Sequence, residues 1–124
     1  MSKRCVLVID DESDIREIAQ MSLQITKDWS VLTAASGHEG VAIASKEQPD
    51  AILLDLIMPG VDGLATLQLL NDTLATQSIP VILLTATAKA ATMQQYAQMK
   101  VKAILVKPFD PGTFGDQIEA ALGW

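Results

Sequence analysis

The chain contains 124 residues, 49% of them hydrophobic and 19% charged, and carries a formal net charge of -6. This length and composition predict one folded domain over residues 1–124 and exclude intrinsic disorder, and the apolar runs are too short for a membrane span or a secretion signal. The single cysteine excludes an internal disulfide and fits a cytoplasmic location, and the negative charge disfavours direct contact with nucleic acid.

Five short apolar runs alternate with helix-like stretches along the chain. The predicted strands are residues 5–10, 30–34, 51–55, 79–85 and 103–106. Three of these runs are almost uninterrupted, which is typical of strands that are covered on both faces. Five strand–helix units in a row predict an α/β fold, in which a parallel sheet lies between two layers of helices.

Each of the first three predicted helices is supported by a local feature of the sequence. Ser36 and Glu39 form a capping box at the start of the second helix. The third helix begins after Gly63. Residues at helical spacing predict the inward faces of the first helix (Ile15, Ile18, Ala19, Ser22) and of the third (Leu67, Leu70, Leu74).

The last two predicted helices flank the fifth strand. The fourth covers about residues 89–99 and has only a narrow apolar stripe. The fifth is predicted to begin at Asp110, because an N-cap residue followed by proline at the first helical position is a typical helix start. Phe114, Ile118 and Leu122 are expected on its inward side.

Polar side chains interrupt the apolar pattern at the ends of four predicted strands. They are Asp10, Asp11, Asp55, Thr85 and Lys107. Each residue type is common at such a position by itself, but the whole set predicts a site, since parallel sheets bind ligands beyond the carboxyl ends of their strands. If the first and third strands are neighbours, about 4.8 Å apart, the three aspartates crowd together. Two carboxylates about 4 Å apart repel by about 4 kcal/mol at a dielectric near 20, and Mg²⁺ with its preference for oxygen ligands relieves that repulsion.

Four motifs resemble those of receiver domains in two-component response regulators, the chemotaxis regulators among them. They are the acidic pair Asp10-Asp11, the stretch D-L-I-M-P-G-V-D-G over residues 55–63, Thr85-Ala86 and Lys107-Pro108-Phe109. The resemblance covers about residues 6–122. It implies a flavodoxin-like, doubly wound (βα)5 sandwich of three layers, whose parallel five-stranded sheet has the order 2-1-3-4-5.

The resemblance also implies what the acidic residues do. Asp55 is expected to accept a phosphoryl group from the phosphohistidine of a sensor histidine kinase or of a phosphotransfer protein in a phosphorelay. Asp11, Asp55 and the backbone carbonyl of Ile57 are expected to hold Mg²⁺, and Asp10 to act through water. Such a domain is a signalling protein and no enzyme, because it promotes only its own phosphorylation and slow self-dephosphorylation.

The phosphoryl group itself is expected to be bound by three further residues. By resemblance, the Thr85 hydroxyl, the Ala86 backbone N–H and the Lys107 ammonium contact its oxygens. Transfer then depends on positioning and charge neutralisation. The Lys107–Pro108 bond is expected to be cis, again by resemblance.

Output is expected to run through the fourth helix, the fifth strand and the fifth helix to an unidentified partner. Many relatives carry an aromatic residue on the fifth strand that turns inward during the switch, and this chain has Ile104 there. Ile57 and Thr87 stand where some relatives carry polar side chains that assist hydrolysis.

Two other functions are weighed against the switch. A phosphohydrolase of the haloacid-dehalogenase type also uses Asp, Thr, Lys and Mg²⁺, but it usually has a D-x-D motif after the first strand and a cap insertion. A receiver fold can also serve as a scaffold that works without phosphorylation, although Asp55, Thr85 and Lys107 are all present here. His38, the single histidine, is expected to be a solvated surface residue.

Overall fold

The computed structural model describes residues 4–55, 63–85, 101–106 and 110–124 of the chain. Within these ranges the strands form one parallel sheet with the order β2-β1-β3-β4-β5, as predicted. The strands are β1 (Cys5–Ile9), β2 (Ser30–Ala34), β3 (Ala51–Asp55), β4 (Val81–Thr85) and β5 (Ala103–Val106).

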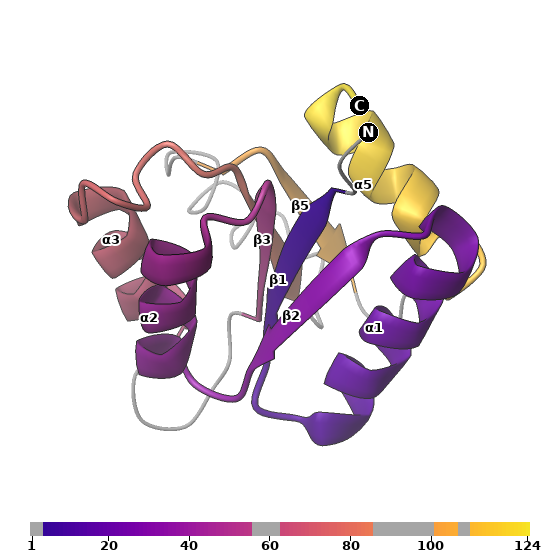
Figure 1. Cartoon of the computed structure of the whole chain (residues 1–124), viewed down its shortest axis with the longest axis horizontal. Coiled ribbons are helices and arrows are strands. Elements are labelled where there is room, and N and C mark those ends of the chain that lie inside the picture. Colours follow the sequence, from indigo (N-terminus) through magenta and orange to yellow (C-terminus); the bar gives the residue numbers. More distant parts are fainter. Residues whose placement is uncertain (1–3, 56–62, 86–100, 107–109) are drawn as a thin grey trace.

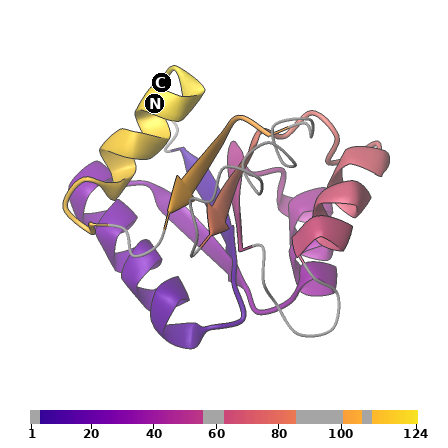
Figure 2. The same ribbon diagram turned by 180° about the vertical axis from the view of Figure 1, so that it is seen from behind.

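Helices cover both faces of this sheet, so the three-layer arrangement is confirmed. The described helices are α1 (Ser13–Lys27), α2 (Gly37–Glu47), α3 (Gly63–Asp72) and α5 (Phe114–Leu122). Figures 1 and 2 show α1 and α5 together on one face, and α2 and α3 on the other. The predicted helix at about residues 89–99 lies outside the described residues.

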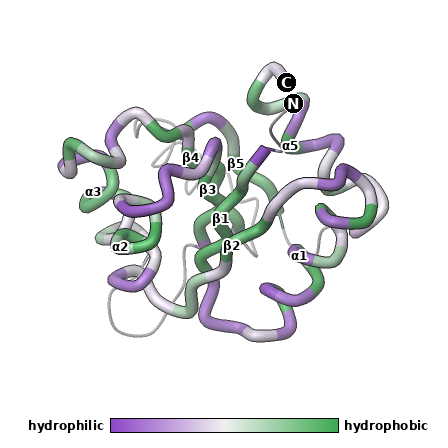
Figure 3. The backbone as a smooth tube through the Cα atoms, in the orientation of Figure 1, coloured by the Kyte–Doolittle hydropathy of each residue, from purple (hydrophilic) through white to green (hydrophobic). Residues whose placement is uncertain are grey.

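The core forms two layers, one on each face of the sheet. Side chains of β1, β3 and β4 alternate between the faces, and all three strands are buried apart from the partly exposed Cys5. Figure 3 shows this concentration of apolar residues in the central strands. Leu7, Ile52 and Leu83 belong to the layer under α2 and α3, and Val8 and Leu53 to the layer under α1 and α5.

Three strand and helix ends differ from the predictions. β1 ends at Ile9, although the Asp10 N–H still donates to the Ala34 carbonyl of β2. β4 begins only at Val81, after Pro80, which has no N–H to donate to a sheet. α3 ends at Asp72, so Leu74 lies beyond the helix with 84% of its surface exposed. The predicted inward role of Leu74 is therefore wrong.

The fifth helix begins three residues later than predicted, with its N-cap at Thr113 in place of Asp110. A turn comes first, in which an Asp110 carboxylate oxygen accepts a hydrogen bond from the Gly112 N–H at 2.8 Å. The Asp110 carbonyl accepts further bonds from the N–H groups of Thr113 and Phe114, and α5 begins at Phe114. Asp110 thus stabilises the turn that leads into the helix. Ser36 is the N-cap of α2, as predicted, since its hydroxyl accepts a hydrogen bond from the Glu39 N–H at 3.2 Å.

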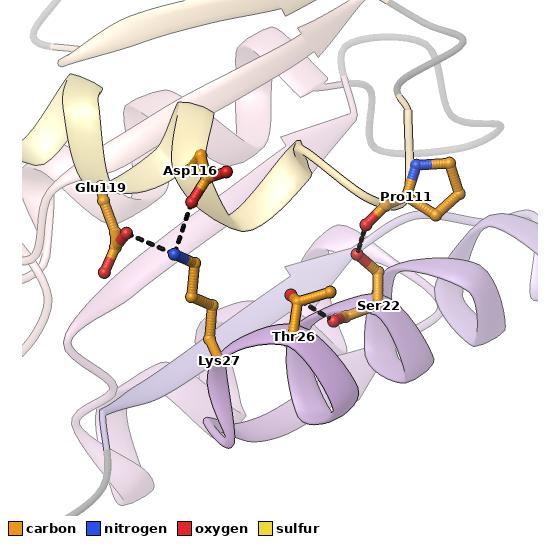
Figure 4. Close-up of polar contacts among 6 residues, drawn as sticks. All are labelled: Ser22, Thr26, Lys27, Pro111, Asp116 and Glu119. Carbon is orange, nitrogen blue, oxygen red and sulfur yellow. Dashed lines mark hydrogen bonds and ion pairs between the residues drawn. The ribbon is translucent and has the colours of Figure 1, made fainter.

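Polar contacts fasten α1 to α5 and to the turn before it (Figure 4). The Lys27 ammonium lies 2.5 Å from a carboxylate oxygen of Asp116 and 2.6 Å from one of Glu119. The Ser22 hydroxyl donates a hydrogen bond to the Pro111 carbonyl. These contacts join segments 89 or more positions apart in the sequence and fix α5 against α1.

An aromatic contact fixes the end of α5 near the amino ends of β1 and β2. The rings of Trp29 and Trp124 meet edge to face with centroids 5.3 Å apart. The Arg4 guanidinium lies 4.0 Å from the centroid of the Trp124 ring. Edge-to-face aromatic pairs and cation–π contacts are both favourable geometries, so both tryptophans contribute to the packing at this end of the molecule.

Candidate functional site

Three carboxylates meet where β1 and β3 end. Asp10 and Asp55 each stand one residue beyond the paired Ile9 and Leu54 of these neighbouring strands. One carboxylate oxygen of each of Asp10, Asp11 and Asp55 lies within 4.8 Å of the others. We call these three residues the acid cluster. Asp10 is completely buried and Asp55 is 5% exposed, whereas Asp11 is open to solvent.

The backbone around Asp10 is held by three hydrogen bonds. Its N–H donates to the carbonyl of Ala34 at the end of β2, at 3.1 Å. Its carboxylate accepts from the Glu12 N–H at 3.0 Å, and its carbonyl accepts from Nη1 of Arg16 at 2.7 Å. No motif in the sequence singles out Arg16, whose contact depends on how α1 packs against the sheet.

Thr85 lies at the same edge of the sheet, on the other side of Asp55. It is the last residue of β4 and is 2% exposed. Asp55 pairs with Leu84, so Thr85 stands one position further toward the site. The structure therefore brings Asp10, Asp11, Asp55 and Thr85 to one edge.

The remaining predicted site residues lie outside the described residues. They are Ile57, Ala86 and Lys107, together with Thr87 and the Lys107–Pro108 bond.

The donor set of the acid cluster fits a hard divalent cation. All the donor atoms are carboxylate oxygens, which Mg²⁺ prefers over nitrogen or sulfur. Burial makes the mutual repulsion of these charges costly, so a cation among them stabilises the fold. Each of the three aspartates offers one carboxylate oxygen to such an ion.

The acid cluster does not include His38, Glu12 or Cys5. His38 is exposed in the first turn of α2, as expected. Glu12 is exposed at the N-cap of α1, and its side chain makes no capping hydrogen bond. Cys5 is only partly buried, and it starts β1, the end of that strand opposite the acid cluster. Burial, and then the charge of Asp50, raise the pKa of the Cys5 thiol.

An exposed apolar surface on α1 was missed by the sequence reasoning. Ile18, Met21 and Ile25 are 42%, 60% and 77% exposed, so the predicted inward position of Ile18 is wrong. We call these three residues the α1 apolar surface. They border a groove of about 370 Å³, which Pro111 and Gly112 close on the α5 side. Their spacing of three and four residues was a visible signal, because it marks a second apolar face beside that of Ala19 and Leu23.

Comparisons with known proteins agree with this geometry. Residues 6–119 match the response regulator receiver domain. The response regulator Rre1 of Synechocystis is 36% identical over 115 residues, which are 93% of this chain and 48% of Rre1. The transcriptional regulatory protein ResD of Bacillus subtilis is 34% identical over 117 residues, 94% of this chain and 47% of ResD. The chain thus spans about half the length of these curated relatives.

Solved structures extend the agreement to three dimensions. The chemotaxis protein CheY4 of Vibrio cholerae superposes with a TM-score of 0.89 at 28% identity, covering 97% of this chain and 99% of CheY4. The N-terminal domain of a response regulator receiver protein from Methanoculleus marisnigri gives a TM-score of 0.79 at 29% identity, covering 99% of both chains. Sequence motifs, sheet order and the family match over most of the chain lead to one conclusion: this chain belongs to the response regulator receiver family of two-component signal transduction.

Proposed function

We propose that Asp55 is the phosphoryl acceptor of a phosphorylation switch and takes its phosphoryl group from a sensor histidine kinase or a phosphotransfer protein. One observation carries the proposal. The Asp55 carboxylate lies at the carboxyl edge of the sheet, beside Asp10 and Asp11 on one side and Thr85 on the other. The family is one of signalling proteins, which fits a switch better than a turnover enzyme.

The transfer itself needs little covalent work from the protein. A carboxylate oxygen of Asp55 attacks the phosphorus, the P–N bond to the donor histidine breaks, and its electron pair stays on the departing imidazole. The product is an acyl phosphate on Asp55. Thr85, the Ala86 N–H and Lys107 bind the phosphoryl oxygens. Mg²⁺, when bound, neutralises negative charge on the phosphoryl group and on the carboxylates.

Asp11, Asp55 and the Ile57 carbonyl are the proposed direct ligands of Mg²⁺, and Asp10 acts through water. The buried position of Asp10 supports this division, because its carboxylate already accepts a hydrogen bond from the Glu12 N–H. Asp11 is exposed and can accept a cation from solvent.

The test of the acceptor uses a small donor, so that no partner protein is needed. Wild type treated with acetyl phosphate and Mg²⁺ is expected to gain one acid-labile phosphate, and Asp55→Asn none. Asp28→Asn, at the far end of α1, is the matched control and should label like wild type. Label that persists on Asp55→Asn contradicts the proposal. Many rapid turnovers of donor would favour the phosphohydrolase, and a wild type that takes no label would favour the scaffold.

The phosphodonor protein is proposed to dock on the α1 apolar surface. A protein that presents a phosphohistidine to Asp55 must approach the edge of the sheet from which α1 begins. Ile18 lies nearest this edge, and Met21 and Ile25 continue the apolar surface along α1. Contiguous exposed apolar surface of this kind marks protein–protein contact. The occupant is therefore an apolar face of the protein that carries the phosphohistidine.

Comparing a protein phosphodonor with acetyl phosphate distinguishes a defect in docking from a defect in phosphoryl transfer. Ile18→Ser and Met21→Ser are expected to slow phosphorylation by a phosphotransfer protein about tenfold or more, since buried apolar anchors dominate interface energetics. Their rates with acetyl phosphate should equal that of wild type. Leu74→Ser removes an even more exposed apolar side chain beyond α3 and should change neither rate. Equal protein-donor rates in all four proteins would contradict docking here.

Output is proposed to pass through the predicted fourth helix, β5 and α5. Charge added at Asp55 attracts the buried Thr85 hydroxyl and shifts an existing equilibrium between two conformations. Ile104 is partly buried against the core layer under α2 and α3, so no aromatic rotamer change is needed. Amide exchange with and without fluoroberyllate should differ most over residues 85–109. A difference confined to the acid cluster would contradict transmission.

We also propose where this receiver is located and that it does not bind DNA directly. Rre1 is a response regulator and ResD a transcriptional regulatory protein, and the described residues of this chain contain no helix long and apolar enough to cross a membrane. We place this receiver in the cytoplasm. Its net charge of -6 disfavours direct binding to DNA.

A further inference from the structure

Arg16 joins the first turn of α1 to the backbone beneath the acid cluster. Its Nη1 donates a hydrogen bond to the Asp10 carbonyl at 2.7 Å, across six positions of sequence. Its own N–H donates to the Glu12 carbonyl at 3.2 Å, which closes the first turn of the helix. The side chain is half-buried, and its hydrogen bond to Asp10 shows that it reaches back to the loop that carries Asp10 and Asp11.

Hydrogen bonds at Asp10 also hold the start of this loop. The Glu12 side chain makes no capping hydrogen bond, and the Asp10 N–H donates to the Ala34 carbonyl at 3.1 Å. The Asp10 carboxylate accepts from the Glu12 N–H, and the Asp10 carbonyl accepts from Arg16. Asp11 lies between these anchors, exposed, and its carboxylate must stay within reach of Asp55.

We propose that Arg16 is a positioning residue for the divalent cation, because it holds the Asp10–Asp11 backbone in the conformation in which the acid cluster binds the ion. This inference rests on the Mg²⁺ site of the proposed function. Groups that hydrogen-bond to the residues around a metal orient its ligands, and their removal typically weakens metal binding by about 10- to 100-fold. Arg16 is no ligand itself, since a guanidinium has no lone pair to offer.

Two effects of Arg16 oppose each other. Its positive charge repels Mg²⁺, so its removal strengthens binding at low ionic strength. Its hydrogen bond orders the loop, so its removal weakens binding at any ionic strength. Salt separates the two effects, because the Debye length falls to about 3 Å at 1 M and the charge of Arg16 is then screened.

The experiment measures the Mg²⁺ dissociation constant by titration calorimetry at low salt and at about 1 M salt. Arg16→Met is compared with Lys27→Met, which removes the other long cation of α1 at its far end, where it contacts Asp116 and Glu119. At high salt Arg16→Met should bind Mg²⁺ about tenfold or more weakly than wild type. Lys27→Met should bind like wild type, and Arg16→Lys, which keeps a donor and the charge, should recover most of the affinity.

Urea unfolding without Mg²⁺ gives the stability of each variant, so that a merely structural role is recognised. A structural role would lower the stability of Arg16→Met and leave its Mg²⁺ affinity at high salt unchanged, and this result would overturn the inference. Equal weakening in Lys27→Met would overturn it as well. Failure of wild type to bind Mg²⁺ is a different result, because it removes the proposed metal site itself.

Discussion

Asp10 and Asp55 occupy equivalent positions on neighbouring parallel strands, each one residue beyond the paired Ile9 and Leu54. The register of β1 and β3 therefore delivers both carboxylates to the same edge, where they are almost completely buried. Two like charges in such a position repel strongly unless something neutralises them. This relationship leads directly to the first two predictions.

Mg²⁺ should stabilise the fold through the acid cluster. A ligand that binds only the folded state adds about 2.7 kcal/mol at a hundredfold excess over its Kd. Thermal melts should therefore rise with Mg²⁺ in wild type and respond much less in Asp11→Ala. Asp28→Asn is the control, since Asp28 lies beyond the far end of α1, at a positive φ that Asn tolerates. Equal responses in wild type and Asp11→Ala would show that the ion binds elsewhere.

Asp55→Asn should raise stability when Mg²⁺ is absent. The substitution removes one of three clustered charges and nearly preserves the shape of the side chain. Pair repulsion at about 4 Å lies between about 1 kcal/mol in water and about 4 kcal/mol at a dielectric near 20, so a gain on the order of 1 kcal/mol is expected. Urea unfolding in the presence of a chelator measures it. A loss of stability would mean that favourable contacts of the Asp55 carboxylate outweigh the repulsion.

The contacts of Lys27 should make the packing of α5 on α1 sensitive to salt and to high pH. Hydrogen bonds to Asp116 and then Glu119 raise the pKa of the Lys27 ammonium. A raised pKa means that the contribution is fully present below the unfolded-state pKa of about 10.4 and is lost as the pH rises through the higher folded-state value. Lys27→Met should therefore be less stable than wild type at neutral pH and low salt.

The difference between these two proteins should shrink in high salt, and also as the pH rises through the raised pKa of Lys27, where the ammonium of wild type loses its proton. The measurement is urea unfolding of both proteins at several pH values and salt concentrations. A stability difference that stays constant over this whole range would assign the effect to the packing of the side-chain stem and not to its charge.

The phosphoryl group on Asp55 should be lost slowly. Ile57 offers no hydrogen bond to an attacking water and Thr87 is short, and both lie outside the described residues. Replacing Ile57 with Asn and Thr87 with Glu should speed decay roughly tenfold or more, where each tenfold corresponds to about 1.4 kcal/mol in the barrier. Decay is followed after the small donor is removed. A double variant that decays no faster than wild type would rule out control by water access.

Several features of this protein could be read from single stretches of sequence. Apolar runs with β-branched residues predicted all five strands to within two residues, because strands covered on both faces admit few polar side chains. The N-cap at Ser36 could likewise be predicted from a few neighbouring residues. The aspartates and Thr85 were visible as polar residues directly after such runs, so the candidate site could be named before the fold was known.

Other features depended on residues that meet only after folding. Ile18 and Leu74 have the spacing of core residues, yet both are exposed, since the packing of α1 and the end of α3 decide which positions the sheet covers. The start of α5 was missed because the Asp110 turn competes with the helix for the same backbone groups.

The sequence by itself determined the strands, the family and the chemical character of the acid cluster, because these depend on residue type and local spacing. Only the tertiary structure decided that Arg16 reaches the Asp10 carbonyl and that Lys27 bridges Asp116 and Glu119. Such contacts depend on the distance and angle between packed helices and the sheet. Those quantities are set by the summed packing of the whole core, and no short stretch of sequence contains them.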